Sequence, residues 1–318
     1  MNNELIDVIV KSRTEQGAGI AVIELVSKDG KPLPTFTAGA HIDVHIGDDL
    51  VRQYSLCSDP ASSDSYRLGV LNDPKSRGGS VKLHAEFAEN RTVSISYPRN
   101  HFPLNENAKK SILAGGGIGI TPMMAMAYTL LHKGEEFELH YCMRTKGAGA
   151  FEQELVDTFS HRIVFHYDDE DKSQLFSPQA SCQPVDANTH IYVCGPTGFM
   201  DWIIASAGEM GYLPAQIHSE YFSAVVDTSG DVFEVYCEQS GVTVTVGSDE
   251  TIAKALKKAG IKVNMSCEEG VCGTCITDVL EGEPDHRDHF LTEEEKGDND
   301  QIALCCSRAK CSRLVIDI

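Results

Sequence analysis

Four cysteines near the C-terminal end constrain this 318-residue chain more than any other feature: Cys267, Cys272, Cys275 and Cys305. Their spacing, C-x4-C-x2-C-x29-C, is the plant-type pattern of a [2Fe-2S] cluster, in which three thiolates share one loop and the fourth returns from a distant segment. Gly270 and Gly273 lie inside the loop, where residues without a Cβ let the backbone curl tightly around the sulfurs. The pattern predicts a protein that transfers electrons one at a time.

Two other uses of these cysteines, a zinc site and disulfides, stay open at this point. Structural zinc usually takes two separated pairs of ligands, whereas this chain has one close pair, a third cysteine upstream and a single distant partner. Disulfides would imply export, but the N-terminus has no basic stretch followed by a long apolar core. With 11 cysteines, we therefore expect reduced or ligating thiols and a cytoplasmic protein. Cys306 could also reach a cluster, although the spacing favours Cys305.

Charge narrows the range of partners. A net charge of −20 argues against nucleic acid, because phosphate binding needs a basic face. No run of about 18 apolar residues exists to span a membrane. From Asp231 onward, 9 Lys and Arg face 18 Asp and Glu, a net of −9. This acidic segment is either a solvated surface or a means of steering toward a basic patch on an electron acceptor.

The length exceeds what one hydrophobic core usually supports, and the pattern predicts three domains. Residues 1–104 contain short β-rich runs separated by turn residues, typical of a closed barrel or sandwich. Residues 105–226 alternate strand and helix signals, which predicts a parallel sheet. Residues 227–318 begin with a linker, DTSGD at 227–231, and continue as a small α+β domain that holds the cysteine loop.

The middle domain opens with a glycine-rich turn, SILAGGGIGITP, that ends at Pro122. We expect a buried strand, a helix with Thr121 as N-cap and Pro122 at its first position, and a stop at Gly134. Such a turn lets a diphosphate approach the backbone at the helix N-terminus. The order differs from G-x-G-x-x-G, so a purely structural turn is equally acceptable on this evidence.

Residues that follow two later strands favour NADH as the ligand. Cys194, Gly195 and Pro196 come after the last clear strand of this domain, and open parallel sheets bind ligands at the carboxyl ends of their strands. Asp168 and Asp169 follow another strand, where a carboxylate accepts hydrogen bonds from ribose hydroxyls and repels a 2′-phosphate. Which of the two aspartates acts in this way stays open.

In the first domain, Arg52, Tyr54 and Ser55 place a cation, an aromatic ring and a hydroxyl on one strand. Arg52 and Tyr54 share a face because side chains alternate along a strand, and Ser55 faces the other way. The tract RGGS at 77–80 follows, and its amides and hydroxyl could cradle a phosphate. A surface arginine and an ordinary turn are equally acceptable.

Together the three regions resemble the phthalate dioxygenase reductase family of flavin and iron–sulfur reductases. The matching motifs are Arg52–Leu56, Ser76–Ser80, Gly116–Pro122, Tyr192–Pro196, Glu220–Phe222, Cys267–Cys275, Pro284–Asp288 and Cys305–Lys310. The resemblance implies a ferredoxin-reductase-type FMN-binding β-barrel, an NAD-binding parallel α/β domain and a plant-type [2Fe-2S] ferredoxin domain of the β-grasp type. It also implies a monomeric NADH-dependent reductase that passes electrons through FMN and the cluster to a separate Rieske-type oxygenase, whose substrate is an aromatic acid or a quaternary amine.

The resemblance also assigns roles to residues. FMN would contact Arg52, Tyr54, Ser55, Leu56, Gly69, Val70, Leu71, Gly78, Gly79 and Ser80. NADH would contact Gly117, Gly119, Thr121, Asp168, Cys194, Gly195 and Pro196. Ser55, Cys194 and Phe222 would line the hydride path, with Phe222 covering the flavin until nicotinamide displaces it.

Electron counting agrees with this set of cofactors. NADH delivers two electrons as a hydride, a [2Fe-2S] cluster accepts one, and a flavin exchanges electrons in either number. A stand-alone NADH:quinone reductase is an alternative. A non-enzymatic iron–sulfur sensor is a weaker one, because it would need neither a flavin motif nor a dinucleotide turn.

Overall fold

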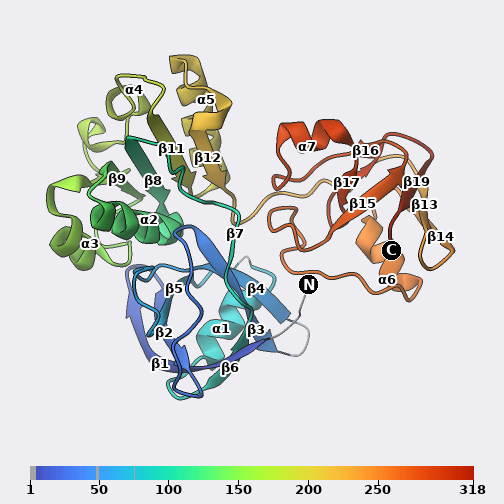
Figure 1. Ribbon diagram of the computed structural model, residues 1–318, viewed down its shortest axis with the longest axis horizontal. Coiled ribbons are helices and arrows are strands. Elements are labelled where there is room, and N and C mark those ends of the chain that lie inside the picture. The colour runs from blue at the N-terminus through green and yellow to red at the C-terminus, as the bar shows by residue number, and fades with distance from the viewer. Residues whose placement is uncertain (1–4, 48–49, 75) are drawn as a thin grey trace. The chain divides into compact units, whose positions relative to one another are not determined.

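The computed structural model describes residues 5–47, 50–74 and 76–318, which divide into two units, Met1–Phe222 and Ser223–Ile318. In Figure 1 the first unit runs from blue to yellow and the second from orange to red. In the described ranges, no helix is both long enough and apolar enough to cross a membrane.

Short strands with alternating burial build an antiparallel sheet in the first hundred residues. It contains β1 (Ile6–Gln16), β2 (Ile20–Ser27), β3 (Ala40–Gly47), β4 (Leu50–Ser55), β5 (Tyr66–Leu71), β6 (Thr92–Ile95) and β7 (Arg99–Asn100). The order is β4-β3-β6-β1-β2-β5, with β7 paired to β3, and helix α1 (Gly79–Glu86) follows β5. On β3 the buried Ile42, Val44 and Ile46 alternate with less buried residues, as a sheet with one face on the core requires. The β-rich character predicted for this part of the chain is therefore confirmed.

The second half of this unit is the predicted parallel sheet. Its strands are β8 (Lys110–Gly116), β9 (Glu136–Met143), β10 (Ile163–Tyr167), β11 (Thr189–Cys194) and β12 (Ile217–Glu220), in the order β10-β9-β8-β11-β12. The connecting helices are α2 (Ile120–Lys133), α3 (Glu152–Phe159), α4 (Pro178–Ser181) and α5 (Thr197–Met210).

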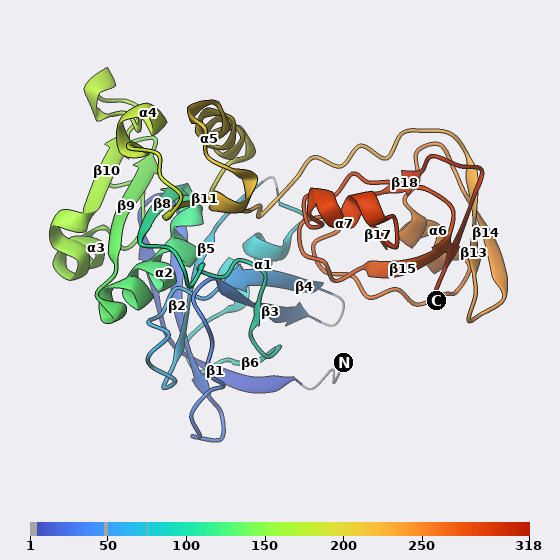
Figure 2. The ribbon, with the colours of Figure 1, turned by 45° about the horizontal axis from the view of Figure 1, so that its top comes forward.

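Helices cover both faces of this parallel sheet (Figure 2). Leu113 packs in one core with residues of α2 and α3, while its neighbour Ile112 packs in another core with residues of α5. Because all strands run in the same direction, their carboxyl ends meet at one edge, where ligands of open parallel sheets bind.

The start of α2 differs from the prediction. The helix begins at Ile120 with Gly119 as N-cap, so Thr121 is not the N-cap and Pro122 is not the first helical residue. The glycine turn itself forms a 3-10 helix, Gly117–Gly119, so the helical conformation begins earlier in the chain than predicted. The expected stop is confirmed, because Gly134 takes a left-handed conformation with φ +67°.

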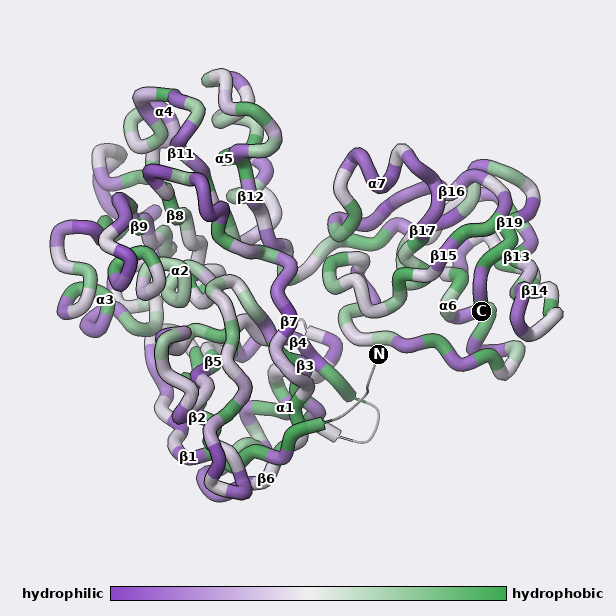
Figure 3. The backbone as a smooth tube through the Cα atoms, in the orientation of Figure 1, coloured by the Kyte–Doolittle hydropathy of each residue, from purple (hydrophilic) through white to green (hydrophobic). Residues whose placement is uncertain are grey.

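The second unit is a small α+β domain, as the sequence predicts. Its elements are β13 (Phe233–Cys237), β14 (Val242–Val246), α6 (Ile252–Lys258), β15 (Ile276–Glu281), β16 (Pro284–Asp285), α7 (Glu293–Asp298), β17 (Gln301–Ala303), β18 (Arg308–Ala309) and β19 (Arg313–Ile316). The main sheet has the order β14-β13-β19-β15-β17, with α6 packed in the same core. The short helix α7 begins with three glutamates and is strongly hydrophilic (Figure 3).

A half-buried ion pair joins the two halves of the first unit. Arg67 on β5 donates to both carboxylate oxygens of Glu154 on α3, at 2.8 and 2.6 Å, and Tyr128 donates to the same carboxylate. The Arg67 guanidinium lies over the Phe151 ring, 5.3 Å from its centre. The Phe151 N–H donates to Gln16 Oε1 at 2.7 Å. These contacts hold the antiparallel sheet against α2 and α3.

Glu154→Gln should lower the free energy of unfolding of the first unit by about 1–2 kcal/mol, because a neutral amide cannot accept both Arg67 donors. Urea denaturation of the full chain measures this loss. The matched control is Asp157→Asn on the exposed face of the same helix, expected within about 0.5 kcal/mol of wild type. A loss no larger than that of the control would show that the ion pair does not stabilise the fold.

Candidate functional site

Three polar side chains meet where the two halves of the first unit face each other. Ser55, at the end of β4 and 5% exposed, donates to Glu220 Oε2 at 3.2 Å. Glu220 ends β12 and pairs in register with Cys194, which ends β11 and is fully buried. Burial raises the pKa of Glu220 to about 8, although the Ser55 hydrogen bond acts in the opposite direction. Burial, with the charge of Glu220, also raises the pKa of the Cys194 thiol well above its usual value. At neutral pH this cluster therefore holds a proton on a carboxyl group.

The sequence alone assigns no role to Glu220. It belongs to the motif Glu220–Phe222, one of the motifs that carry the family resemblance. Its position at the carboxyl end of a parallel strand is the signal that could have found it, since such ends line ligand sites.

The glycine-rich turn lies directly against the Cys194 turn. A Cβ on Gly119 would lie 2.2 Å from the Cys194 carbonyl oxygen, so only glycine permits this approach. Gly117 has φ +54°, and a Cβ built on it would have no atom within 4 Å. The N-terminus of α2 carries no side-chain cap among the described residues. This backbone fits the diphosphate of a dinucleotide, which needs open amide groups at a helix N-terminus.

The remaining predicted NADH residues lie at or near the same edge, in different surroundings. Thr121 is 2% exposed and donates to the Ile118 carbonyl at 3.0 Å, so its hydroxyl supports the turn. Gly195 is partly exposed and Pro196 exposed. Asp168 and Asp169 are both exposed directly after β10, so their surroundings do not distinguish them.

The predicted FMN residues include a cation beside a helix N-terminus. A Cβ on Gly79 would lie 2.7 Å from Arg52 Cγ, so the Arg52 side chain crosses the first turn of α1. Gly78 precedes this turn with φ +85°, and Ser80 Oγ accepts a hydrogen bond from the Asp73 N–H at 3.3 Å. A guanidinium beside the first turn of a helix fits a phosphate group, because both favour an anion.

Other predicted FMN residues line the β4–β5 side of the barrel. Burial raises the pKa of Tyr54, on the same face of β4 as Arg52. Gly69 lies where the antiparallel sheet meets α2, and a Cβ on it would be 2.9 Å from Thr121 Cγ2. The Val70 carbonyl accepts a hydrogen bond from His84 Nε2 at 2.8 Å when that nitrogen is protonated. The rest differ in exposure, from the buried Leu56 to Leu71 at 38% and Phe222 at 37%.

The four predicted cluster cysteines come together around a tightly curled loop of the second unit. The Cys267 N–H points to Cys272 Sγ at 3.5 Å, and the Glu269 N–H points to Cys267 Sγ at 3.4 Å. Cys305 arrives from beyond β17 and interacts with the thiols of Cys267 and Cys275. Four thiols, two of which have N–H groups aimed at their sulfurs, fit a [2Fe-2S] cluster, because such donors stabilise ligated thiolates.

Cys306 lies behind this loop. It is 1% exposed, and a Cβ on Gly270 would lie 2.5 Å from its sulfur. Its sulfur is also 3.8 Å from Ser307 Oγ. This arrangement supports Cys305 as the fourth ligand, as the spacing predicts.

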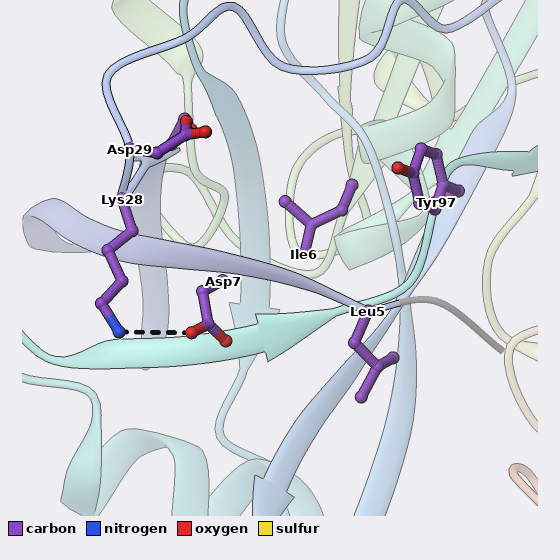
Figure 4. A pocket seen from close by; sticks show the side chains of 7 residues that line it. Leu5, Ile6, Asp7, Lys28, Asp29 and Tyr97 are labelled. Atoms are coloured by element: carbon purple, nitrogen blue, oxygen red, sulfur yellow. Dashed lines mark hydrogen bonds and ion pairs between the residues drawn. The ribbon is translucent and has the colours of Figure 1, made fainter.

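A separate groove of about 560 Å³ lies beside the start of β1 (Figure 4). It is lined by Leu5, Ile6, Asp7, Ser27, Lys28, Asp29 and Tyr97. The ion pair between Lys28 and Asp7, 3.2 Å long, crosses one side of it. None of the predicted cofactor residues lines this groove.

Comparison with known proteins covers the whole chain. Residues 113–204 match the oxidoreductase NAD-binding domain family, and residues 235–310 match the 2Fe-2S iron-sulfur cluster binding domain family. The chain is 45% identical to a vanillate O-demethylase oxidoreductase of Pseudomonas sp. (strain HR199 / DSM 7063), over 99% of this chain and 100% of that protein.

Solved structures give the same result for the fold. Phthalate dioxygenase reductase, described as a modular structure for electron transfer from pyridine nucleotides to [2Fe-2S], matches with a TM-score of 0.76 and 34% identity, over 99% of this chain and 98% of that one. An intact type IV self-sufficient cytochrome P450 monooxygenase matches with a TM-score of 0.88 and 34% identity. The match covers 99% of this chain and only 41% of that longer protein.

Cys305→Ser should lose most of the bound iron, while Cys306→Ser should retain it, because the Cys305 thiol interacts with those of Cys267 and Cys275, whereas the Cys306 sulfur lies against Gly270 and Ser307. Iron content and visible absorbance of the two purified variants test this difference. Loss of iron from Cys306→Ser, with retention in Cys305→Ser, would reverse the assignment.

Glu220→Gln should change how stability depends on pH. Between pH 4.5 and about 8, the unfolded chain has lost the Glu220 proton while the fold retains it, so wild-type stability falls as pH rises. The glutamine variant lacks this titration. Its melting temperature relative to wild type should therefore increase from pH 5 to pH 8.5. Glu209→Gln, on the exposed side of α5, is the control, and equal behaviour of both variants would contradict the raised pKa.

Proposed function

Because the chain belongs to the phthalate dioxygenase reductase family of oxygenase reductases, we propose that its partner is a Rieske-type oxygenase that demethylates vanillate. The protein is an NADH-dependent flavin and iron–sulfur oxidoreductase, and its cofactors are FMN, NADH and a [2Fe-2S] cluster. It transfers electrons to a separate oxygenase. The observation that carries the proposed substrate is the full-length similarity to vanillate O-demethylase oxidoreductases.

We assign the residues of the first unit as follows. Arg52 and the first turn of α1 would bind the FMN phosphate, and the glycine turn before α2 would bind the NADH diphosphate. FMN, when bound, accepts a hydride from NADH and releases its electrons singly. Ser55 and Glu220 would hold a proton where the two halves of the first unit face each other, beside the buried Cys194. The chain thus contributes orientation and electrostatics.

The acidic second unit supports docking on a basic acceptor. Helix α7 carries Glu293, Glu294 and Glu295 in its first turn, and Thr292 caps it through the Glu295 N–H. Long-range attraction between opposite charges accelerates association and weakens as salt is added. A stand-alone quinone reductase would gain nothing from this charge.

We also place the protein in the cytoplasm as a monomer with domains 1–104, 105–226 and 227–318. The support for the compartment is that the eleven cysteines form no disulfide within the described structure. The division into domains is supported by the separate antiparallel and parallel sheets and by the unit boundary after Phe222.

The test is NADH-driven release of formaldehyde from vanillate by this protein with a purified vanillate O-demethylase oxygenase. We expect release that falls as salt increases and that is lost in Cys272→Ser, while NADH still reduces the flavin of that variant. If wild type reduces ferricyanide with NADH but yields no formaldehyde, vanillate is the wrong substrate. If quinone turnover is rapid and the oxygenase adds nothing, the protein is a stand-alone reductase.

A further inference from the structure

The segment that joins the two units is only partly free. Residues 223–232 lie outside the helices and strands. Val225 is 99% exposed, whereas Val226 packs against the hydrophobic core of the second unit. The sequence predicts a linker at residues 227–231, but two arginines of the second unit hold these residues.

Arg308 is the first of these arginines, and it is almost completely buried, with 1% exposure. Its Nη1 donates to the carbonyls of Thr228 and Glu250 at 2.7 and 2.6 Å, and its Nη2 donates to those of Asp231 and Gly247 at 2.8 and 2.9 Å. A buried guanidinium is costly unless its donors are satisfied, and here four backbone carbonyls satisfy them. Thr228 and Asp231 are therefore fixed to the second unit.

Arg287 is the second, and it holds the preceding residues from a less buried position. Its Nη1 donates to the carbonyls of Asp227 and Ser229, both at 2.7 Å, while Asp285 accepts from its Nε and Nη2 at 2.8 and 2.6 Å. The Asp227 carboxylate accepts from the N–H and hydroxyl of Ser229, which forms a local turn and turns both carbonyls toward Arg287.

Both arginines belong to segments that surround the cysteines. Arg308 follows Cys305 by three residues. The Arg287 N–H donates to Ser307 Oγ at 3.1 Å, and its neighbour Asp288 lies against Gly270 of the cysteine loop. The connecting segment is thus attached directly to the shell of the cluster site.

We propose that Arg287 and Arg308 are positioning residues for electron transfer from flavin to cluster. By binding the carbonyls of residues 227–231, they leave Ser223, Ala224 and Val225 as the free tether between the units. The proposal rests on the electron route of the family and does not depend on which oxygenase is served.

Tether length matters because it sets the concentration of one unit around the other. Three free residues reach roughly 10 Å when extended. Once a tether is long enough to span the two units, the effective concentration falls roughly as the −3/2 power of its length. Loss of the Arg287 contacts would leave Val226 held only by its packing against the core of the second unit. Release of Val226 and Asp227 would then lengthen the tether to five residues, while Arg308 still holds Thr228. A tether of five free residues in place of three should slow transfer about twofold.

The experiment compares Arg287→Gln with a chain that carries two glycines inserted between Ala224 and Val225, which lengthens the tether equally without touching the arginines. Arg313→Gln is the matched control, an arginine of the same unit whose guanidinium lies over the Tyr236 ring. Stopped-flow absorbance of the holoenzyme, mixed with NADH without an oxygenase, separates flavin reduction from cluster reduction. Amide hydrogen exchange of residues 226–230 reports the attachment directly.

We expect Arg287→Gln and the insertion to slow cluster reduction about twofold, with unchanged flavin reduction and an unchanged cluster potential. Only Arg287→Gln should speed hydrogen exchange in residues 226–230, and Arg313→Gln should match wild type. Unchanged exchange in Arg287→Gln would overturn the proposal, as would unchanged or faster cluster reduction in either lengthened chain. Failure of NADH to reduce the flavin of wild type would instead refute the electron route itself.

Discussion

The close approach of two backbone turns at one edge of the parallel sheet is the constraint on which the first unit depends. Gly119 lies so near the Cys194 carbonyl that no side chain fits between them. This contact brings the start of α2 beside the end of β11, and Glu220 pairs with Cys194 on the next strand. The predicted nucleotide turn and the buried proton-holding cluster are therefore built on the same edge.

The two units use polar groups in opposite ways. In the first, the buried Ser55 donates to the partly buried Glu220, and burial raises the pKa of this carboxyl group because ionisation in a poorly solvated site is costly. In the second, the carboxylates of α7 stay hydrated on the surface, where they act over a distance. The Ser55–Glu220 pair suits chemistry at a fixed position in the first unit. The exposed carboxylates of α7 suit association with a separate protein.

The connection between the units joins these two roles. A buried Arg308 replaces bulk solvent around four backbone carbonyls and makes residues 228–231 part of the cluster unit. Gly230 accommodates this, since a Cβ there would lie 2.8 Å from Arg308 Nε. Residues 227–231, which the sequence predicts as a linker, are therefore held by the second unit. The flexible connection is confined to Ser223, Ala224 and Val225.

Local patterns in the sequence were enough to predict the cysteine loop, the glycine turn and the alternation of strands and helices, because each depends on spacing along the chain. The resemblance added the cofactors, and the comparisons confirm them. Only the tertiary structure decided the start of α2, the position of Cys306 behind the loop and the attachment of residues 227–231. It alone brought Ser55 to Glu220, 165 residues away, because contacts between distant segments depend on how the sheets pack.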